Sequence, residues 1–177
     1  KIPESVTEIG TYAFKNTGCN TKAVGGINVA YSYEGEGYAK WLLTTSVTQQ
    51  TVNFTIEKNT IGIAGGAIYG YADSFIGQLK LGDTDNRTLK YIGDYAFDFN
   101  ALSSIFGLQY TQIKTIGIEA FSNCSSLSGA IRLPNTIESI GAKAFTSAGI
   151  SSLSIDHDTA RTTKCTIGQE AFLNCSS

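Results

Sequence analysis

Charged residues are scarce in this sequence. Asp, Glu, Lys and Arg make up 16 % of the 177 residues, against about 25 % in an average soluble domain. The net charge is −2 and no run of lysine or arginine occurs, which excludes the clustered basic surface that nucleic-acid binding requires. No apolar run approaches the roughly 20 residues of a membrane-spanning helix, and there is no charged-then-apolar leader. Ser, Thr, Asn and Gly replace the missing charge, a composition that favours a protein working outside the cell.

The sequence also lacks the patterns of common catalytic and metal sites. There is no Gly-x-Ser-x-Gly, no P-loop and no paired-cysteine zinc spacing. The only histidine, His157, stands between Asp156 and Asp158. These residues could form a metal or acid–base cluster, or they could belong to a solvated loop after a strand. We favour the loop, because a single histidine without converging partners lacks the geometry that catalysis needs. Residues 82–87 offer oxygen ligands but not the glycine and closing glutamate of an EF-hand, so turn chemistry explains them. We therefore expect no enzyme activity, metal or cofactor.

One short string, Ile-Gly-x-x-Ala-Phe, dominates what the sequence does contain. It occurs at Ile9–Phe14, Ile92–Phe97, Ile116–Phe121, Ile140–Phe145 and Ile167–Phe172. The phenylalanines of the three central copies are 24 residues apart, and a fixed period of this size is the signature of a stacked array. Glycine tolerates backbone angles that other residues avoid. We therefore expect it to let the chain leave a strand sharply, with Ile, Ala and Phe directed inward.

A sixth, degenerate copy precedes the regular ones. Residues 60–69 align with residues 136–145 when Ala64 stands for the inward isoleucine and Gly65 for the glycine. This alignment predicts that Tyr69 takes the place of the turn phenylalanine.

Between the turns lie segments in which apolar and polar residues alternate. They are Phe75–Leu81, Leu102–Phe106, Leu127–Leu133 and Ile150–Asp156. A period of two means one buried and one wet face, and equivalent strands of successive repeats must pair in parallel, about 4.8 Å apart. Short segments such as Ile113–Ile116 predict a second extended column, and the Ala-Phe turns a third side with one helical turn each. The sequence thus predicts a β-rich, right-handed repeat solenoid with a parallel sheet face.

Residues 27–54 do not repeat. Val29, Tyr31 and Tyr33 alternate with small or polar residues, residues 34–37 supply turn chemistry, and residues 38–43 resume an apolar run. This pattern predicts an inserted β-hairpin followed by a Thr/Gln-rich stretch.

The repeat pattern resembles the BspA-like, Treponema-type leucine-rich repeat. Residues 120–133 carry it most fully, with Ala-Phe, a cysteine three residues on, and the strand up to Pro134. The inserted segment at 31–43 also resembles the hairpin that interrupts many arrays of this family. Thr17 and Ala148 depart from the family's cysteine. The resemblance implies a leucine-rich-repeat fold and a secreted or cell-surface protein, in a family associated with adhesion to host matrix proteins and other cells.

From the resemblance we expect residues 1–177 to form a single solenoid domain, excised from a longer array because neither end has the polar cap of a natural terminus. We expect a non-enzymatic adhesion module at the cell surface or outside the cell, which recognises a protein or other macromolecule. A purely structural spacer or stalk of a large surface protein is the alternative. The resemblance does not transfer a ligand.

Strand alternation suggests where a partner binds. If Ile131 and Leu133 point inward, Arg132 points outward, and the same phase exposes Lys80 and Phe106. A large aromatic beside an arginine is typical of an interface centre. The hairpin adds further aromatic candidates, namely Tyr33, Tyr38 and Trp41. The alternative is that the hairpin rings pack on the flank of the stack and only seal the insertion.

The four cysteines are expected to be unpaired. Cys124 and Cys175 share one repeat phase but lie two coils apart, about 10 Å at roughly 4.8 Å per coil, beyond the about 7 Å that a disulfide spans between Cα atoms. Cys19 and Cys165 belong to other coils or sides. We expect at least two of the four to be buried as small hydrophobic residues.

Overall fold

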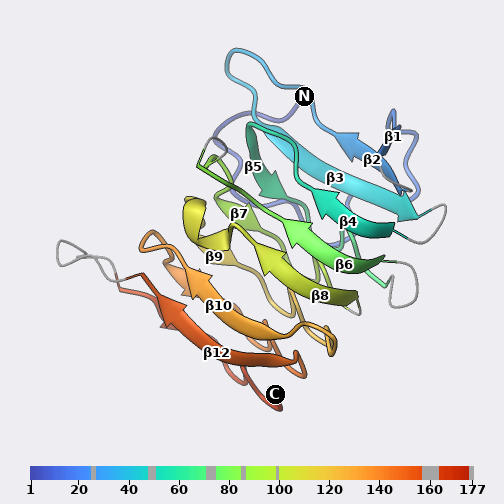
Figure 1. Ribbon diagram of the computed structural model, residues 1–177. Coiled ribbons are helices and arrows are strands. Elements are labelled where there is room, and N and C mark those ends of the chain that lie inside the picture. The colour runs from blue at the N-terminus through green and yellow to red at the C-terminus, as the bar shows by residue number, and fades with distance from the viewer. Residues whose placement is uncertain are drawn as a thin grey trace.

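The chain winds into a solenoid of short strands and turns (Figure 1). The computed structural model describes residues 1–24, 27–47, 51–70, 75–84, 87–98, 100–156 and 164–175. Two columns of strands run along the stack, and turns form a third side. The predicted β-rich, leucine-rich-repeat-like solenoid with parallel strand pairing is confirmed.

The outer strand column is split into two sheets. One contains β4 (Thr51–Thr55), β6 (Phe75–Lys80) and β8 (Ala101–Phe106), and the other β10 (Gly129–Leu133) and β12 (Ile150–Ile155). All pairings within the two sheets are parallel. A 3-10 turn, η1 (Leu108–Tyr110), separates β8 from β10. The expected insertion included residues 51–54, but they lie in β4 and pair with β6.

The second column is one sheet of eight strands in the order β1-β2-β3-β5-β7-β9-β11-β13. The strands are β1 (Lys22–Val24), β2 (Ile27–Tyr31), β3 (Lys40–Val47), β5 (Thr60–Ile63), β7 (Tyr91–Ile92), β9 (Thr115–Ile116), β11 (Ser139–Ile140) and β13 (Thr166–Ile167). From β3 onward the pairing is parallel. Each short strand of the middle coils contributes one fully buried isoleucine, as Ile92 and Ile116 do.

The Ala-Phe side consists of hydrogen-bonded turns, so the predicted helical turns are wrong. η1 is the only helix among the described residues. In the turns that the structure describes completely, two left-handed residues lie four positions apart, for example Glu119 (φ 52°) and Asn123 (φ 57°). A helix requires consecutive right-handed angles, so these residues stop it. Backbone N–H groups on this side instead donate to the next coil, as Phe121 donates to Ala144 O at 2.7 Å.

The glycine of Ile-Gly-x-x-Ala-Phe has a different role from the one expected. Among the described residues, positive φ angles occur at the fourth string position, as at Tyr95 and Glu119, and not at this glycine. A Cβ on Gly117 would lie 2.5 Å from Asp94 N, and one on Gly141 would lie 2.5 Å from Ile118 N. From Gly93 onward the glycines are therefore needed because successive coils approach too closely for a side chain, whereas a Cβ on Gly10 in the first coil would meet nothing within 4 Å.

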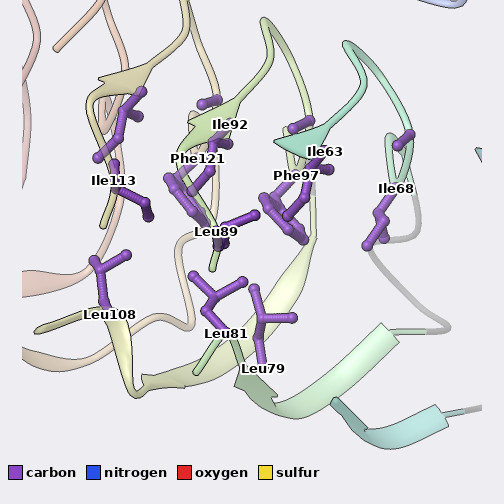
Figure 2. Close-up of a cluster of buried hydrophobic side chains, with 14 of the residues drawn as sticks. Ile63, Ile68, Leu79, Leu81, Leu89, Ile92, Phe97, Leu108, Ile113 and Phe121 are labelled. Atoms are coloured by element: carbon purple, nitrogen blue, oxygen red, sulfur yellow. The ribbon is translucent and has the colours of Figure 1, made fainter. Parts of the chain in front are cut away.

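Aromatic rings stack along the interior. Phe97, Phe121, Phe145 and Phe172 form a ladder with successive centroid distances of 4.9, 5.2 and 5.4 Å and interplanar angles below 10°. Figure 2 shows Phe97 and Phe121 between the isoleucines of the second column and leucines such as Leu79 and Leu81. This core buries the isoleucines Ile63, Ile92, Ile116 and Ile140 of the second column, whereas Ile167 in the last coil is exposed. Such burial is the main source of stability in a stacked array.

The degenerate coil fits the repeat in a register one residue away from the predicted one. Ile63 pairs with Ile92, and the Ile68 N–H donates to Ala96 O just as Phe97 N–H donates to Ala120 O. Ile68 is therefore the ladder residue and is fully buried, whereas Tyr69 is half-buried. The prediction for Tyr69 is wrong because Ala64 occupies the glycine position, not the isoleucine position.

Three residues, Asn100, Cys124 and Cys175, each follow a ladder phenylalanine by three positions and form a column of side-chain hydrogen-bond donors. Asn100 Nδ2 donates to Ile68 O at 2.6 Å, and the thiols of Cys124 and Cys175 donate to Phe97 O at 3.1 Å and Phe145 O at 3.0 Å. In each case the acceptor is the ladder residue of the preceding coil. All four cysteines are unpaired, but only Cys124 is buried and the other three are half-exposed. The expectation of two buried cysteines is thus wrong.

The inserted hairpin is formed by β2 and β3, which pair antiparallel. β3 also pairs in parallel with β5, so the hairpin occupies a strand position of the second column. Trp41 is fully buried, with its ring parallel to that of Tyr91 at 5.8 Å and in contact with Gly62. Trp41 therefore cannot contact a partner as predicted, because β3 faces the solenoid and not the solvent.

Candidate functional site

The best candidate surface lies where the outer strand column is split. Phe106 ends β8 and is 43 % exposed. Arg132 lies in the next strand, β10, and its side chain is 63 % exposed. Both line one small cavity of about 130 Å³, together with Ile105, Gly107 and Ile131. The structure thus brings together two of the residues that strand alternation points outward.

The split has a local cause at Gly107. Its φ of 84° lies in the left-handed region, and it leads directly into η1. A Cβ at this position would lie 1.9 Å from Gly82 O, so no other residue fits the close passage over the preceding coil. The turn diverts the chain after Phe106. β8 and β10 belong to different sheets, and one backbone hydrogen bond, from Ser128 N–H to Ser103 O at 3.2 Å, joins β8 to the residue before β10.

A second aromatic, Tyr110, widens the apolar surface. It is 36 % exposed, and its ring lies 6.4 Å from that of Phe106. The Lys80 ammonium lies 5.9 Å from the Phe106 ring centroid and pairs with Asp83 at 2.7 Å. We call Lys80, Phe106, Tyr110 and Arg132 the outer aromatic surface. The sequence analysis missed Tyr110; the signal for it was the Gly107 turn directly after the strand.

The charges of this surface are paired on the protein itself. Arg132 Nη2 lies 3.0 Å from Asp156 Oδ1, between strands β10 and β12. Exposed ion pairs of this kind contribute about 0–1 kcal/mol to stability. The pair therefore matters more for the position of the Arg132 side chain than for the stability of the fold. A partner would meet two ordered cations around an apolar centre, which is the composition of an interface core and its rim.

The hairpin tip presents the remaining predicted residues. Tyr33 is 55 % exposed and packs edge-on against the half-buried Tyr38 at 6.1 Å, with the Lys1 ammonium 4.9 and 5.1 Å from the two rings. Tyr38 also lines a groove of about 540 Å³, together with Glu34 and Lys90. This groove shares no residue with the cavity of the outer aromatic surface. The two predicted contacts are therefore separate surfaces.

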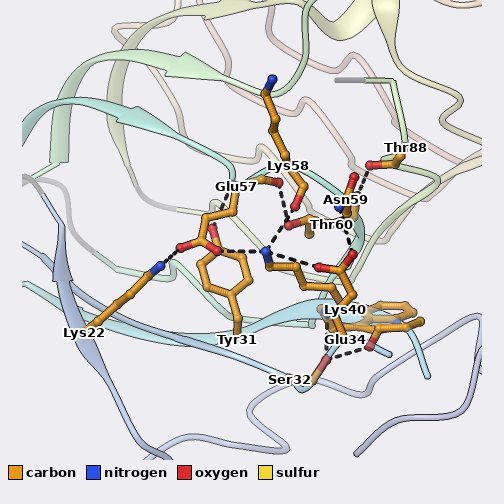
Figure 3. Close-up of polar contacts among 12 residues, drawn as sticks. Lys22, Tyr31, Ser32, Glu34, Lys40, Glu57, Lys58, Asn59, Thr60 and Thr88 are labelled. Atoms are coloured by element: carbon orange, nitrogen blue, oxygen red, sulfur yellow. Dashed lines mark hydrogen bonds and ion pairs between the residues drawn. The ribbon is translucent and has the colours of Figure 1, made fainter. Parts of the chain in front are cut away.

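A network of charges anchors the base of the hairpin (Figure 3). Glu57 pairs with Lys22 and with Lys40, the latter at 2.9 Å, and its backbone N–H donates to the Tyr31 hydroxyl at 3.2 Å. Burial works against the Glu57 carboxylate, but its bonds to the two lysines prevail and lower its pKa below 4.5. Burial raises the pKa of Tyr31. The network holds β1, β2 and β3 against the loop before β5.

Nothing in the described part of the chain forms a metal site. No group of three or more His, Cys, Asp or Glu side chains suited to a metal ion is found there. His157 and Asp158 lie outside the described residues, as do Asp85 and Asn86 of the loop considered for Ca²⁺. No helix within the described ranges is long and apolar enough to cross a membrane.

Comparison with known proteins gives one family and one structure. The family model described as "BspA type Leucine rich repeat region" matches residues 1–31 and 50–177, in six copies. The unmatched residues 32–49 contain the hairpin tip and β3. No curated protein sequence matches the chain significantly. The chain is similar to the crystal structure of a leucine-rich repeat protein from Bacteroides ovatus ATCC 8483, with 23 % identity, a TM-score of 0.44, and 71 % of this chain and 35 % of that one covered. The chain thus spans about a third of that protein.

Proposed function

Since the chain belongs to the BspA-type leucine-rich-repeat family, we propose that it is a non-enzymatic adhesion module, secreted or at a cell surface. Repeats of this family in general serve protein interaction, and the proteins that carry them are typically surface-associated or secreted. In this proposal the partner is a macromolecule such as a host matrix protein or a component of another cell.

The observation that carries the proposal is the outer aromatic surface. The rings of Phe106 and Tyr110 stay exposed there, although Leu102 of β8 and Leu133 of β10 are completely buried. Exposed aromatics beside an arginine are enriched at the energetic centres of interfaces. The left-handed conformation of Gly107 also forms the turn that places Tyr110 beside Phe106. In this proposal Tyr33 and Tyr38 at the hairpin tip form a second contact.

The test is binding to immobilised matrix proteins and to cells. The double variant Phe106→Ala/Arg132→Ala should lower affinity at least tenfold, because two central residues together contribute roughly 2 kcal/mol or more. Leu173→Ala is the matched control, since Leu173 is 45 % exposed on the turn side. Tyr33→Ala tests the hairpin tip separately. Unchanged binding by all folded variants, with folding checked by circular dichroism, would falsify this assignment of the site.

A spacer is the second candidate function, favoured by the rest of the outer face. Away from the outer aromatic surface, its exposed side chains are small or polar, such as Gln78, Ser152 and Ser154. If the protein is a spacer, the wild type should bind neither the matrix proteins nor the cells. If it is an adhesion module, the wild type should bind them and only the site variants should lose binding.

A further inference from the structure

Three tyrosines gather on the turn side of the solenoid, away from the outer strand column. The ring of Tyr12 meets Tyr69 edge-on, with centroids 5.3 Å apart and planes at 82°. Tyr95 belongs to the next coil, which is joined to the coil of Tyr69 by the hydrogen bond from Gly66 N–H to Asp94 O at 2.8 Å. All three are half-buried. We call Tyr12, Tyr69 and Tyr95 the tyrosine cluster.

The cluster exists because of the irregular coil. Tyr12 and Tyr95 occupy the same left-handed turn position, with φ of 59° and 56°, and Gly66 occupies it in the coil between them. A Cβ on Gly66 would lie 2.5 Å from two atoms of the Tyr12 ring. The Tyr12 ring therefore packs directly against the glycine. With Ile68 as ladder residue, the next side chain, Tyr69, reaches the surface beside it.

The cluster already holds one ammonium group. Lys15 Nζ lies 4.4 Å from the Tyr12 ring centroid and 5.9 Å from that of Tyr69. A cation within about 6 Å of an aromatic face is attracted by the ring quadrupole. Lys15 is exposed, so this contact is one that solvent or another cation can replace.

Carboxylates add a negative potential around the rings. Burial raises the pKa of Tyr95, and the neighbouring Glu119, Asp94 and Asp98 raise it further. Burial likewise raises the pKa of Tyr12, with contributions from Tyr69 and Asp98. No ion pair between described residues involves Asp94 or Glu119. In the described part of the chain no lysine or arginine forms an ion pair with them, and Asp94 Oδ1 accepts a hydrogen bond from Ile118 N–H at 2.6 Å.

We propose that the tyrosine cluster binds a lysine or arginine side chain from a basic segment of a partner protein. The rings contact the cation, Glu119 and Asp94 complement its charge, and Lys15 takes the place of the ligand in its absence. This surface is separate from the outer aromatic surface, so either can be lost while the other still binds. It adds a partner chemistry, a cationic protein segment, that the adhesion proposal does not specify.

The test measures the affinity of a capped Gly-Ser peptide with lysine at every third position, against the same peptide with glutamine. The wild-type protein should prefer the lysine peptide. Tyr12→Gly and Tyr95→Gly remove the rings while the backbone keeps its left-handed angle, as Gly66 shows is possible. Each should weaken binding about threefold to tenfold. Lys143→Gly, at the same turn position with φ 56°, should leave it unchanged.

Two further variants separate the cluster from general attraction to an acidic protein. Lys15→Ala should tighten binding up to about threefold, because the intramolecular cation no longer competes. Glu119→Gln should weaken binding more than Glu170→Gln, although both remove one charge. Equal affinity for the two peptides, equal loss in the two glutamine variants, or unchanged binding by both tyrosine variants would overturn the proposal.

Discussion

From Leu89 onward each coil carries the intact Ile-Gly-x-x-Ala-Phe string, whereas the part before it contains the hairpin and the degenerate coil. The later coils share the phenylalanine ladder, the close glycine contacts and the buried isoleucines. The earlier part has Ile68 in the ladder, β3 in place of a repeat strand, and the ion-pair network of Glu57. The regular part is held by stacked apolar contacts, and the irregular part also by individual polar ones.

The difference also separates stability from surface chemistry. In the regular coils the recurring Ile, Gly, Ala and Phe of the string contact neighbouring coils, which leaves little for a partner. The tyrosine cluster arises where the string is degenerate, and the outer aromatic surface arises where the strand column is split. Departures from the repeat are thus where this solenoid gains side chains that other molecules can reach.

The largest effect is expected from breaking the ladder. Phe121 is fully buried between two parallel rings. Phe121→Ala should lower the free energy of unfolding by about 3–5 kcal/mol. Phe14→Ala, at the same string position in a half-buried setting, should cost clearly less. Urea unfolding followed by circular dichroism measures both; equal losses would mean that the ladder does not distinguish the regular coils.

The next effect concerns the close contacts between coils. Gly117→Ala places a methyl group against Asp94 and Gly93 and should cost about 1–3 kcal/mol. Gly10→Ala meets nothing within 4 Å, so it should be neutral or slightly stabilising, because alanine restricts the unfolded chain. Thermal unfolding of the two variants compares them, and similar melting temperatures would contradict the role given to the glycines.

A smaller effect is expected at high pH. Burial raises the pKa of the Cys124 thiol from 9.0 to about 12. Above pH 9.0 the unfolded chain loses this proton while the folded chain keeps it, so stability falls as pH rises, by at most about 1.4 kcal/mol per pH unit. Cys124→Ala should be less stable at neutral pH, by about 1 kcal/mol for the hydrogen bond, but should lack this part of the alkaline slope. Parallel slopes for the two proteins would rule the mechanism out.

The smallest effect is expected at the hairpin base. The pKa of Glu57 is lowered from 4.5, so its ion pairs stabilise the fold above that pH and the contribution is lost as pH falls through the folded pKa. Glu57→Gln should cost about 1 kcal/mol at neutral pH, since the pairs are partly exposed. The difference from wild type should vanish in acid. Denaturation at several pH values tests this, and a difference that persists in acid would point to packing instead of charge.

The fold follows from the sequence wherever the repeat is intact. The period of the phenylalanines gives the parallel pairing of the second column and of β10 with β12, and alternation along β8 and β10 is enough to expose Phe106 and Arg132. It does not give the split between β8 and β10, because that split depends on the turn at Gly107. Local rules fail where the repeat degenerates. From the sequence alone, Ala64 can be aligned with either the isoleucine or the glycine of the string. The pairing of Ile63 with Ile92 shows that Ile63 takes the isoleucine position and Ala64 the glycine position.

Long-range contacts explain the remaining misses. Alternation identifies β3 as a strand but not the strand it pairs with, so Trp41 could be exposed on a free hairpin or buried against Gly62. The tyrosine cluster joins residues from three coils, and no local pattern brings Tyr12 to Tyr69. The expected role of glycine followed from its conformational freedom, but close packing between neighbouring coils is what excludes other residues.

At the left-handed positions of the turns, the side chain can change while the backbone conformation stays the same. Tyr12, Tyr95, Glu119, Lys143 and Glu170 share one backbone angle but differ in size and charge. A residue other than glycine costs about 1–3 kcal/mol at such a position and a β-branched one is disfavoured most, but this chain has aromatic, acidic and basic side chains there. Selection can therefore alter the turn surface one coil at a time, from aromatic to acidic to basic, without disturbing the stack beneath it.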